Sequence, residues 1–515
     1  MLACATLAPT APLAFARGRA ASADAASSQD DSDAPESIAL ADVLTAAVRK
    51  SPGLAMARAD RSEAAQRVGA ADIIDAWHVL FRATGQDAQS PAQLTPPGAP
   101  LATRAVSGEL GLSRSLSTGG DVSVAVATSD VQYLYPIATG AQVASPSGLA
   151  LGGEIATLRL TATQPLVRGA GDDAARAGQK LQKLAGRQLA AEADDEAAEL
   201  VRQLVVTYWE LAYSDEELAV DREGEQLAVK QVAITAEVVR TGMQPPSANQ
   251  IAQLQVALRR EAILRDETQR DDHSLTLRRL AGLELAGAPL QAGDDSDDAS
   301  PIPADRVEAD VVAAAQAHGP GLAQKRLEQT GADVQVAASD NATLPKVDLS
   351  LTGEVSGVAD DLGTAFDRVG SGQMYSVMGG LTVQWDIGGG ASAAAGAAHV
   401  HRARLEAERA DLDRQLEAAA MSASRQLARA RERAQLSVSA VDVAREALRA
   451  EIVAFQAGRS TTQSVFQRQD DLSQAKLRLA RARIDAIEAD VLVDYLTGGL
   501  LARYGITVAD KRRAE

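Results

Sequence analysis

The feature that most constrains the fold is an uninterrupted helical pattern from about Ala174 to Arg240, which contains no proline. Apolar residues recur along it at a spacing of three and four, which places them on one face of a helix. At about 1.5 Å per residue, this run would form a rod on the order of 100 Å long. The acids at positions 192–199 exclude a membrane span, so we expect a soluble coiled-coil-like rod. A matching run from about Ala393 to Phe455 predicts a second rod.

Composition argues against several classes of function. The chain of 515 residues carries a formal net charge of -18, whereas nucleic-acid binding requires a basic surface. Its single cysteine, Cys4, allows neither an internal disulfide nor a cysteine metal cluster. Only His399 and His401 lie close together among the histidines, and a spacing of two puts them on different helix faces. We therefore expect no enzyme, no metal site and no cofactor.

One glycine motif, Gly169-Ala-Gly171-Asp-Asp-Ala174, has the spacing of a dinucleotide-binding loop. That interpretation needs a buried apolar strand and a helix short enough to return within one βαβ unit. Here the preceding strand alternates with polar residues, and the helix continues for much longer. The glycines are better explained as the point where the chain passes from sheet to rod.

The amino-terminal residues predict export from the cytoplasm. Residues 1–16 resemble a signal peptide that ends in Ala14-Phe15-Ala16, although the usual basic start is missing and we expect the true start to lie upstream. A lipoprotein acylation site at Cys4 is the alternative interpretation. Residues 17–36, rich in Ala, Ser and Asp, are expected to be a disordered leader.

The rest of the chain is predicted to be an internal duplication. The sequence from Ala41 to Arg58 returns in similar form from Ala309 to Arg326. The predicted first repeat covers residues 37–290 and the second covers 308–497, each with a helix, strands, a long helix, a turn and a returning helix. An acidic linker at 291–307 separates them, and residues 498–515 form a tail. The returning helices are expected over 247–280 and up to about 496.

Six segments alternate apolar and polar residues as strands do. Four lie in the first half, at about 73–81, 106–116, 122–131 and 155–165, and two lie in the second, at 344–355 and 376–387. A short turn at 117–120 and long loops at 84–102, 130–153 and 356–373 match the pattern of outer-membrane barrels, in which closure also removes exposed sheet edges. The alternative is a soluble sheet packed on a helical domain.

Several segments together resemble the TolC-type outer-membrane efflux channel family. They are Ser51-Pro-Gly-Leu54, Leu160-Thr-Ala-Thr-Gln-Pro-Leu-Val-Arg-Gly169, Tyr208-Trp-Glu-Leu211 and the turns at Gly242 and Gly458. The resemblance covers the chain from Ser37 to Leu500, and the duplicated order makes it specific. It implies an α+β membrane protein: a homotrimer with a transmembrane β-barrel in outer-membrane lipid, continued by an α-helical coiled-coil barrel in the periplasm. It also implies an exit duct for drug efflux or type I secretion, working with a periplasmic adaptor and an inner-membrane pump. The alternative is a periplasmic coiled-coil scaffold or adaptor-like protein.

The resemblance also implies two functional regions. Gly242, Met243 and Gln244, with Gly458, Arg459 and Ser460, would form the periplasmic tips that narrow the tunnel and contact the adaptor. Gln164, Pro165, Gly169, Gly388 and Gly389 would form the junction between barrel and helices.

Two features depart from the family pattern. The acids that often follow the tip glycines are absent, and Asp470 and Asp471 lie about one turn further on. Four strands are predicted in the first half instead of two. The extra hairpin at 106–131 either joins the barrel wall, which would raise a trimer above the usual twelve strands, or folds outside it.

Overall fold

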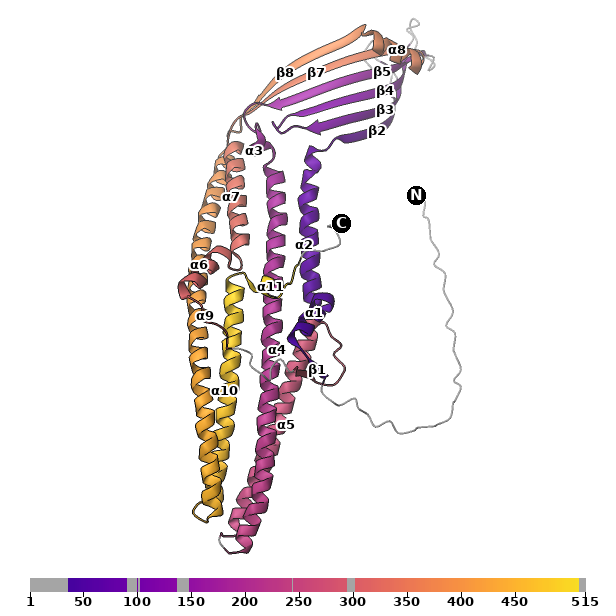
Figure 1. The fold of residues 1–515 in the computed structure, drawn as a ribbon. Helices are drawn as coiled ribbons and strands as arrows, with labels where there is room; N and C mark the ends of the chain where they lie inside the picture. The colour runs from indigo at the N-terminus through magenta and orange to yellow at the C-terminus, as the bar shows by residue number, and fades with distance from the viewer. Residues whose placement is uncertain are drawn as a thin grey trace, which may run out of the picture.

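The computed structural model describes residues 36–89, 100, 102–136, 148–242, 244–293 and 302–508. The predicted signal peptide, the leader up to residue 35, Cys4 and Met243 lie outside these residues. The molecule is elongated, with a sheet at one end and long helices that run from it to two turns at the other end (Figure 1). Among the described residues, no helix is both long and apolar enough to cross a membrane.

Two long helices form the length of the molecule. They are α4 (Ala177–Arg240) and α9 (Gly390–Gln456), and the returning helices are α5 (Ser247–Ala281) and α10 (Thr462–Leu496). The predicted rods and returning helices are thus confirmed within a few residues. The first rod differs at its start, because a separate turn, α3 (Asp172–Ala175), ends at the non-helical Arg176 before α4 begins.

Shorter helices complete the helical layer. They are α1 (Leu40–Lys50), α2 (Pro52–Ala70), the 3-10 helix η2 (Ala71–Asp75), α6 (Glu308–His318), α7 (Leu322–Ala342) and α11 (Leu500–Arg503). Near the sheet, α2, α4, α7 and α9 pack side by side in that order, and toward the turns the order is α5, α4, α10 and α9. Four helices therefore lie abreast at either level. The chain breaks at Ser51-Pro52, since α1 ends at Lys50 and α2 begins at Pro52.

The large sheet contains six strands in the order β2-β3-β4-β5-β7-β8, and every neighbouring pair is antiparallel. The strands are β2 (His78–Gln89), β3 (Ala102–Ser115), β4 (Asp121–Pro136), β5 (Gly148–Pro165), β7 (Lys346–Ala359) and β8 (Met374–Gln384). The hairpin of β3 and β4 lies inside this sheet, between β2 and β5. A hairpin folded outside the sheet is therefore excluded.

Several sequence predictions for this end of the molecule were wrong. The loops predicted at 84–102 and 130–153 overlap strands, because β2 extends to Gln89, β4 extends to Pro136 and β5 begins at Gly148. The first strand does not begin at Ile73, because residues 71–75 continue α2 as η2 and β2 starts at His78. The predicted loop at 356–373 is partly helical: β7 extends to Ala359, and α8 (Leu362–Ser371) follows it. The Asp361 side chain caps α8 by accepting a hydrogen bond from the backbone N–H of Thr364 at 3.0 Å.

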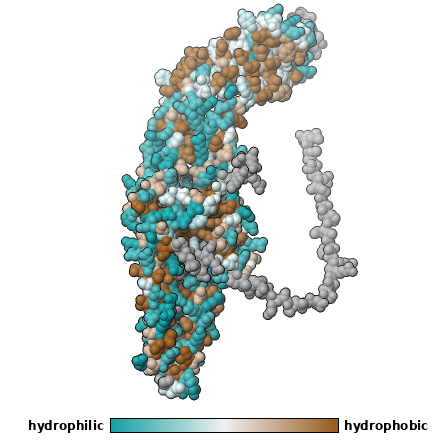
Figure 2. Space-filling view, viewed as in Figure 1, coloured by the Kyte–Doolittle hydropathy of each residue, from teal (hydrophilic) through white to brown (hydrophobic). Residues whose placement is uncertain are grey.

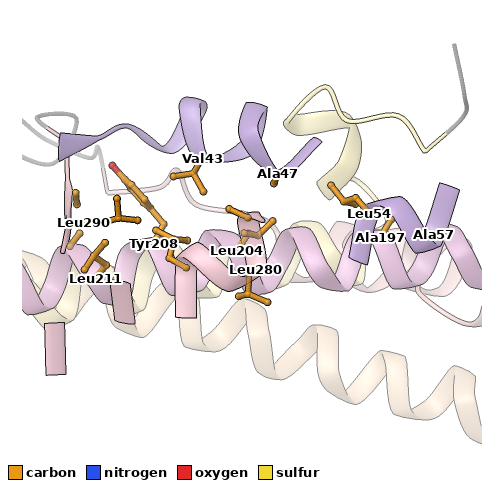
Figure 3. Close-up of a cluster of buried hydrophobic side chains, with 14 of the residues drawn as sticks. Val43, Ala47, Leu54, Ala57, Ala197, Leu204, Tyr208, Leu211, Leu280 and Leu290 are labelled. Carbon is orange, nitrogen blue, oxygen red and sulfur yellow. The ribbon is translucent and has the colours of Figure 1, made fainter. Parts of the chain in front are cut away.

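The main apolar core lies halfway along the helices, where α1, α2, α4 and α5 meet a small sheet of two parallel strands, β1 (Glu36–Ile38) and β6 (Leu290–Ala292). Val43, Leu204, Tyr208 and Leu290 are fully buried there (Figure 3). Tyr208 and Trp209 also contact each other edge to face, with ring centroids 5.5 Å apart. Both rings thus act as packing residues of this core.

Candidate functional site

The six-stranded sheet has one apolar and one polar face. Residues paired across the sheet form an apolar row that includes every strand: Phe81, Leu110, Val126, Leu158, Val355 and Tyr375. The next row below it contains Val79, Leu112, Val124, Leu160, Gly353 and Val377. Figure 2 shows hydrophobic residues gathered over this end of the molecule. So large an exposed apolar surface is typical of an interaction with lipid or protein.

The opposite face carries charged and hydroxyl side chains. Arg159 Nε donates to Glu354 Oε2 at 3.0 Å across β5 and β7, and Arg82 lies 3.7 Å from Glu109 across β2 and β3. The Thr84 hydroxyl lies 2.6 Å from that of Ser107. Alternation between an apolar and a polar face at every second residue is the pattern of a transmembrane barrel, whose outer side faces lipid and whose inner side faces water.

Within the described residues, both edge strands of the sheet, β2 and β8, lack a neighbouring strand on one side. Their large apolar side chains are mostly exposed, with Phe81 of β2 and Tyr375 of β8 each 74% accessible. Trp385, just beyond β8, is 73% accessible. Long exposed edges of this kind readily pair with another strand, because their backbone N–H and C=O groups have no partner in the sheet.

The junction between sheet and helices is held by the short turn between β3 and β4. Gln164 Nε2 donates to Thr118 O at 3.0 Å, and Thr118 Oγ1 donates back to Gln164 Oε1 at 2.8 Å. Pro165 and Gly169 lie beside the same turn, since a Cβ at Gly119 would lie 3.2 Å from Pro165 Cγ and 2.2 Å from Gly169 O. The structure thus brings three of the five predicted junction residues together around this turn.

The other two junction residues lie in more open surroundings. Apart from atoms of the adjacent residues, no described atom lies within 4 Å of a Cβ built on Gly388 or Gly389. Gly389 is the residue that precedes α9. The two halves of the junction are nevertheless tied to each other, because Arg168 Nη1 donates to Asp386 Oδ2 at 2.6 Å.

Each predicted tip is a tight turn with a glycine in the left-handed backbone conformation. Gly242 has φ of 76° and Gly458 has φ of 70°, and no atom lies within 4 Å of a Cβ built on either. Glycine is therefore required for the backbone conformation and not for space. At the second tip, the Ser460 hydroxyl donates to the Glu451 carboxylate and the Arg459 N–H donates to Ala454 O at 2.9 Å.

Several polar contacts connect the hairpin of α4 and α5 to the hairpin of α9 and α10 toward the tips, among them the Thr235 and Thr462 hydroxyls, which lie 3.5 Å apart. We call the three contacts that follow the inter-hairpin links. Thr462 Oγ1 donates to Gln244 Oε1 at 3.2 Å, which places the predicted tip residue Gln244 against the second hairpin. Further from the tips, Arg259 of α5 donates to Asp470 of α10, and Lys476 of α10 donates to Glu223 of α4. Phe466 of α10 also packs against Ala228 and Ala252 of the first hairpin.

Electrostatics concentrate around the Arg259 link. Arg259 Nη1 also donates to Asp221 Oδ1 at 2.9 Å, so one guanidinium holds carboxylates from both hairpins. Asp266 lies next to Asp221 and is only 1% exposed. Burial, together with a hydrogen bond with the Asp221 carboxyl, raises the pKa of Asp266 to about 6.

Comparison with solved structures identifies the architecture. The structure of CusC matches with a TM-score of 0.65 and 13% sequence identity, covering 89% of this chain and 92% of that chain. The outer-membrane protein VceC from Vibrio cholerae matches with a TM-score of 0.63 and 15% identity over 89% and 96%, and the CmeC outer-membrane channel from Campylobacter jejuni with 0.62 and 13% over 92% and 90%. The chain has the TolC-type outer-membrane channel fold. No protein-family model and no curated protein sequence matches the chain.

Within this channel fold, sequence reasoning missed the inter-hairpin links. Arg259 and Asp470 are separated by 211 positions, and nothing in their local sequences predicts that they meet. Thr462 could have been found from the motif Ser460-Thr461-Thr462-Gln463-Ser464, because it opens a helix directly after the tip glycine. Indeed, the Thr461 side chain caps α10 by accepting from the Ser464 N–H at 3.2 Å.

Proposed function

We propose that three copies of this chain close into a β-barrel in the outer membrane, continued by a helical tunnel through the periplasm. In this role the protein is an exit duct for an inner-membrane pump that expels small molecules or secretes protein. The observation that carries the proposal is the sheet, which is apolar on one face, polar on the other and unpartnered along both edges. Such a sheet is stable only when lipid covers the apolar face and another strand covers each edge.

The strand directions permit closure between copies. The six strands alternate in direction, so β2 and β8 run in opposite senses. Strand β8 of one copy can therefore pair with β2 of the next in the same antiparallel manner as every pair within the sheet. The number of copies comes from the family resemblance, whose members are trimers.

The diameters expected for a ring of strands and for a ring of helices also agree. Three copies would supply eighteen strands, because each supplies six. With strands about 4.8 Å apart and tilted by about 40°, eighteen would close a cylinder about 36 Å across. Four helices abreast in each copy would give a ring of twelve, which at about 9 Å between axes is about 34 Å across. Twelve strands, the family's usual number, would give only about 24 Å.

The outer helices of the layer expose the apolar side chains that a ring of copies would bury. Ile251, Leu254 and Leu258 lie on α5 at a spacing of three and four, and all are exposed. Leu436 and Val443 are exposed on α9, seven residues apart, as in a coiled-coil seam. Since α5 and α9 lie at opposite ends of the helical layer, these stripes would meet between neighbouring copies.

The duct would open and close at the tips. We place the adaptor contact at Gly242, Met243 and Gln244 and at Gly458, Arg459 and Ser460, because the ends of α4 and α9 and the starts of α5 and α10 lie furthest from the sheet (Figure 1). Separation of the two hairpins would widen the tunnel, and the inter-hairpin links would oppose that movement. The similar order of helices and strands in the two halves supports an origin by internal duplication.

The proposal is tested by extracting the full-length protein from isolated outer membranes and measuring its mass in detergent. We expect a trimer that requires detergent to remain dispersed and that conducts ions in a planar bilayer. The alternative, a periplasmic scaffold, predicts recovery in the soluble periplasmic fraction. A monodisperse soluble monomer in plain buffer would rule out the duct.

A further inference from the structure

We propose that helix α8 is a membrane-surface anchor, which rests on the outer side of the barrel and inserts Leu362 and Phe366 among the lipid acyl chains of the outer leaflet. This inference rests on the proposed barrel and adds a lipid-binding element to it. Three properties of α8 support it: the face of the sheet that the helix covers, the height at which it lies, and the side chains that it leaves uncovered.

Helix α8 packs on the apolar face of the sheet. Its Ala365 is fully buried against Ala156 of β5 and Ala359 of β7. Gly357, which pairs with Ala156, lies directly beneath the helix, and a Cβ there would lie 2.1 Å from the Ala365 carbonyl oxygen. Gly357 stands on the same side of β7 as Leu351 and Val355, because these positions alternate by two. The helix backbone thus lies against the side of the sheet that would face lipid.

The helix lies at the upper limit of the apolar band. The Ala156 and Gly357 pair is two residues beyond Leu158 and Val355, which belong to the apolar row that includes every strand. Two residues further in the same direction, Glu154 pairs with Asp130 of β4. The side chains on this face change from apolar to acidic across the level of α8. That level corresponds to the boundary between acyl chains and head groups.

Helix α8 is amphipathic, as a helix that lies in a membrane surface must be. Leu362, Ala365, Phe366 and Val369 are spaced by three and four, and form one apolar stripe. Ala365 and Val369 contact the sheet, whereas Leu362 and Phe366 each remain 40% exposed. Asp367 and Arg368 are exposed beside this stripe, and the Arg368 guanidinium donates to Val358 O.

Lipid is a better occupant than a second copy of the chain. Helix α8 packs chiefly on β5 and β7, so β8 lies between it and one edge of the sheet, and three strands lie between it and the other. The segment from Asp360 to Ser371 carries three acids against one arginine, which gives anionic head groups no charge attraction. Its affinity would come from apolar burial and should depend little on salt.

The test measures the depth of single fluorescent labels in lipid. Single cysteines are placed at Phe366→Cys and, as a matched control on the polar side, at Asp367→Cys, in the Cys4→Ser background. Leu160→Cys marks the middle of the apolar face and Thr161→Cys marks the polar face. Each is labelled with an environment-sensitive fluorophore and reconstituted in phosphatidylcholine vesicles that contain nitroxides at a shallow or a deep acyl position, after its trimer mass has been verified.

We expect the label at position 366 to be quenched severalfold more by the shallow nitroxide than by the deep one, and the label at position 160 to show the reverse. Labels at 367 and 161 should respond to aqueous iodide instead. If position 160 is quenched by lipid and position 366 responds only to iodide, or to neither quencher, α8 lies in water or against another copy and the anchor is refuted. If position 160 itself is not quenched, the barrel of the proposed function fails.

Discussion

The Arg259 link allows the proposed opening movement to be tested by removing a single charge. Asp470→Asn removes the carboxylate that α10 contributes, but it leaves the pair between Arg259 and Asp221 within the first hairpin intact. The change therefore weakens the contact between hairpins without leaving Arg259 unpaired. Because Asn is nearly the same size as Asp, packing around Phe466 should be unchanged.

The expected magnitude follows from exposure. Asp470 is 38% exposed and Arg259 is 17% exposed, so the pair is partly screened and should contribute about 1 kcal/mol. If the three copies open together, three links are lost, and the closed state is weakened by about 3 kcal/mol relative to the open one. That change corresponds to roughly a 100-fold shift in the equilibrium between open and closed tips.

The assay is single-channel recording of the purified trimer in planar bilayers, where the fraction of time spent in high-conductance states reports tip opening. Glu225→Gln is the matched control, because Glu225 accepts a bond from Arg260 Nε at 2.7 Å within the first hairpin. We expect D470N to raise the open fraction strongly and E225Q to leave it unchanged. Equal open fractions in the two variants would show that the link does not hold the tips closed.

Three further predictions concern other parts of the molecule. Replacing Gly242 or Gly458 by Glu should impair export and leave the trimer intact, as measured by efflux from cells and native mass, because both glycines lie in open surroundings. Burial raises the pKa of Asp215 to about 6, so the native state binds more protons than the unfolded state between about pH 4 and pH 7, and the free energy of unfolding falls as the pH rises through that range. Asp215→Asn should flatten this dependence and raise the free energy of unfolding by about 1–2 kcal/mol at pH 7.5. Thermal unfolding midpoints at several pH values would measure both effects. Deleting residues 102–136 should leave β2 to pair with β5 and narrow the barrel from about 36 Å to about 24 Å, which averaged electron micrographs can measure; an unchanged diameter would contradict an eighteen-stranded wall.

The long helices could be predicted from sequence because a spacing of three and four, sustained over many turns, places apolar side chains on one side of a helix and of no other regular structure. The bounds of α5 and α10 were predicted to within a residue or so, because each helix begins directly after a glycine turn. Strand existence was also predictable from alternation. Strand register was not, because it depends on pairing between segments as distant as β5 and β7.

Two local errors have physical causes that can be stated. Residues 73–81 alternate as a strand does, but the first part of that run follows α2 without any break as η2. Ion pairs of Asp72 with Lys183 and of Asp75 with Arg176 connect this segment to the start of α4. Helix α8 was overlooked among glycines and acids, although Asp361 stands at its start and Leu362, Ala365, Phe366 and Val369 repeat at helical spacing. A short amphipathic helix inside a loop has this signature of cap plus stripe.

The distribution of apolar and polar contacts along the helices explains why movement is expected at the tips and not elsewhere. Two buried clusters, one of them the largest, lie halfway along the molecule, where α1, α11 and the small sheet of β1 and β6 cover α4 and α10. Toward the tips, the hairpins meet through the small group around Phe466 and through the inter-hairpin links. Exposing buried apolar side chains to water costs free energy in proportion to the area exposed. Ion pairs near solvent can instead exchange their protein partners for water at low cost. The same chain thus has a rigid middle that can hold the barrel and a far end that can separate without unfolding.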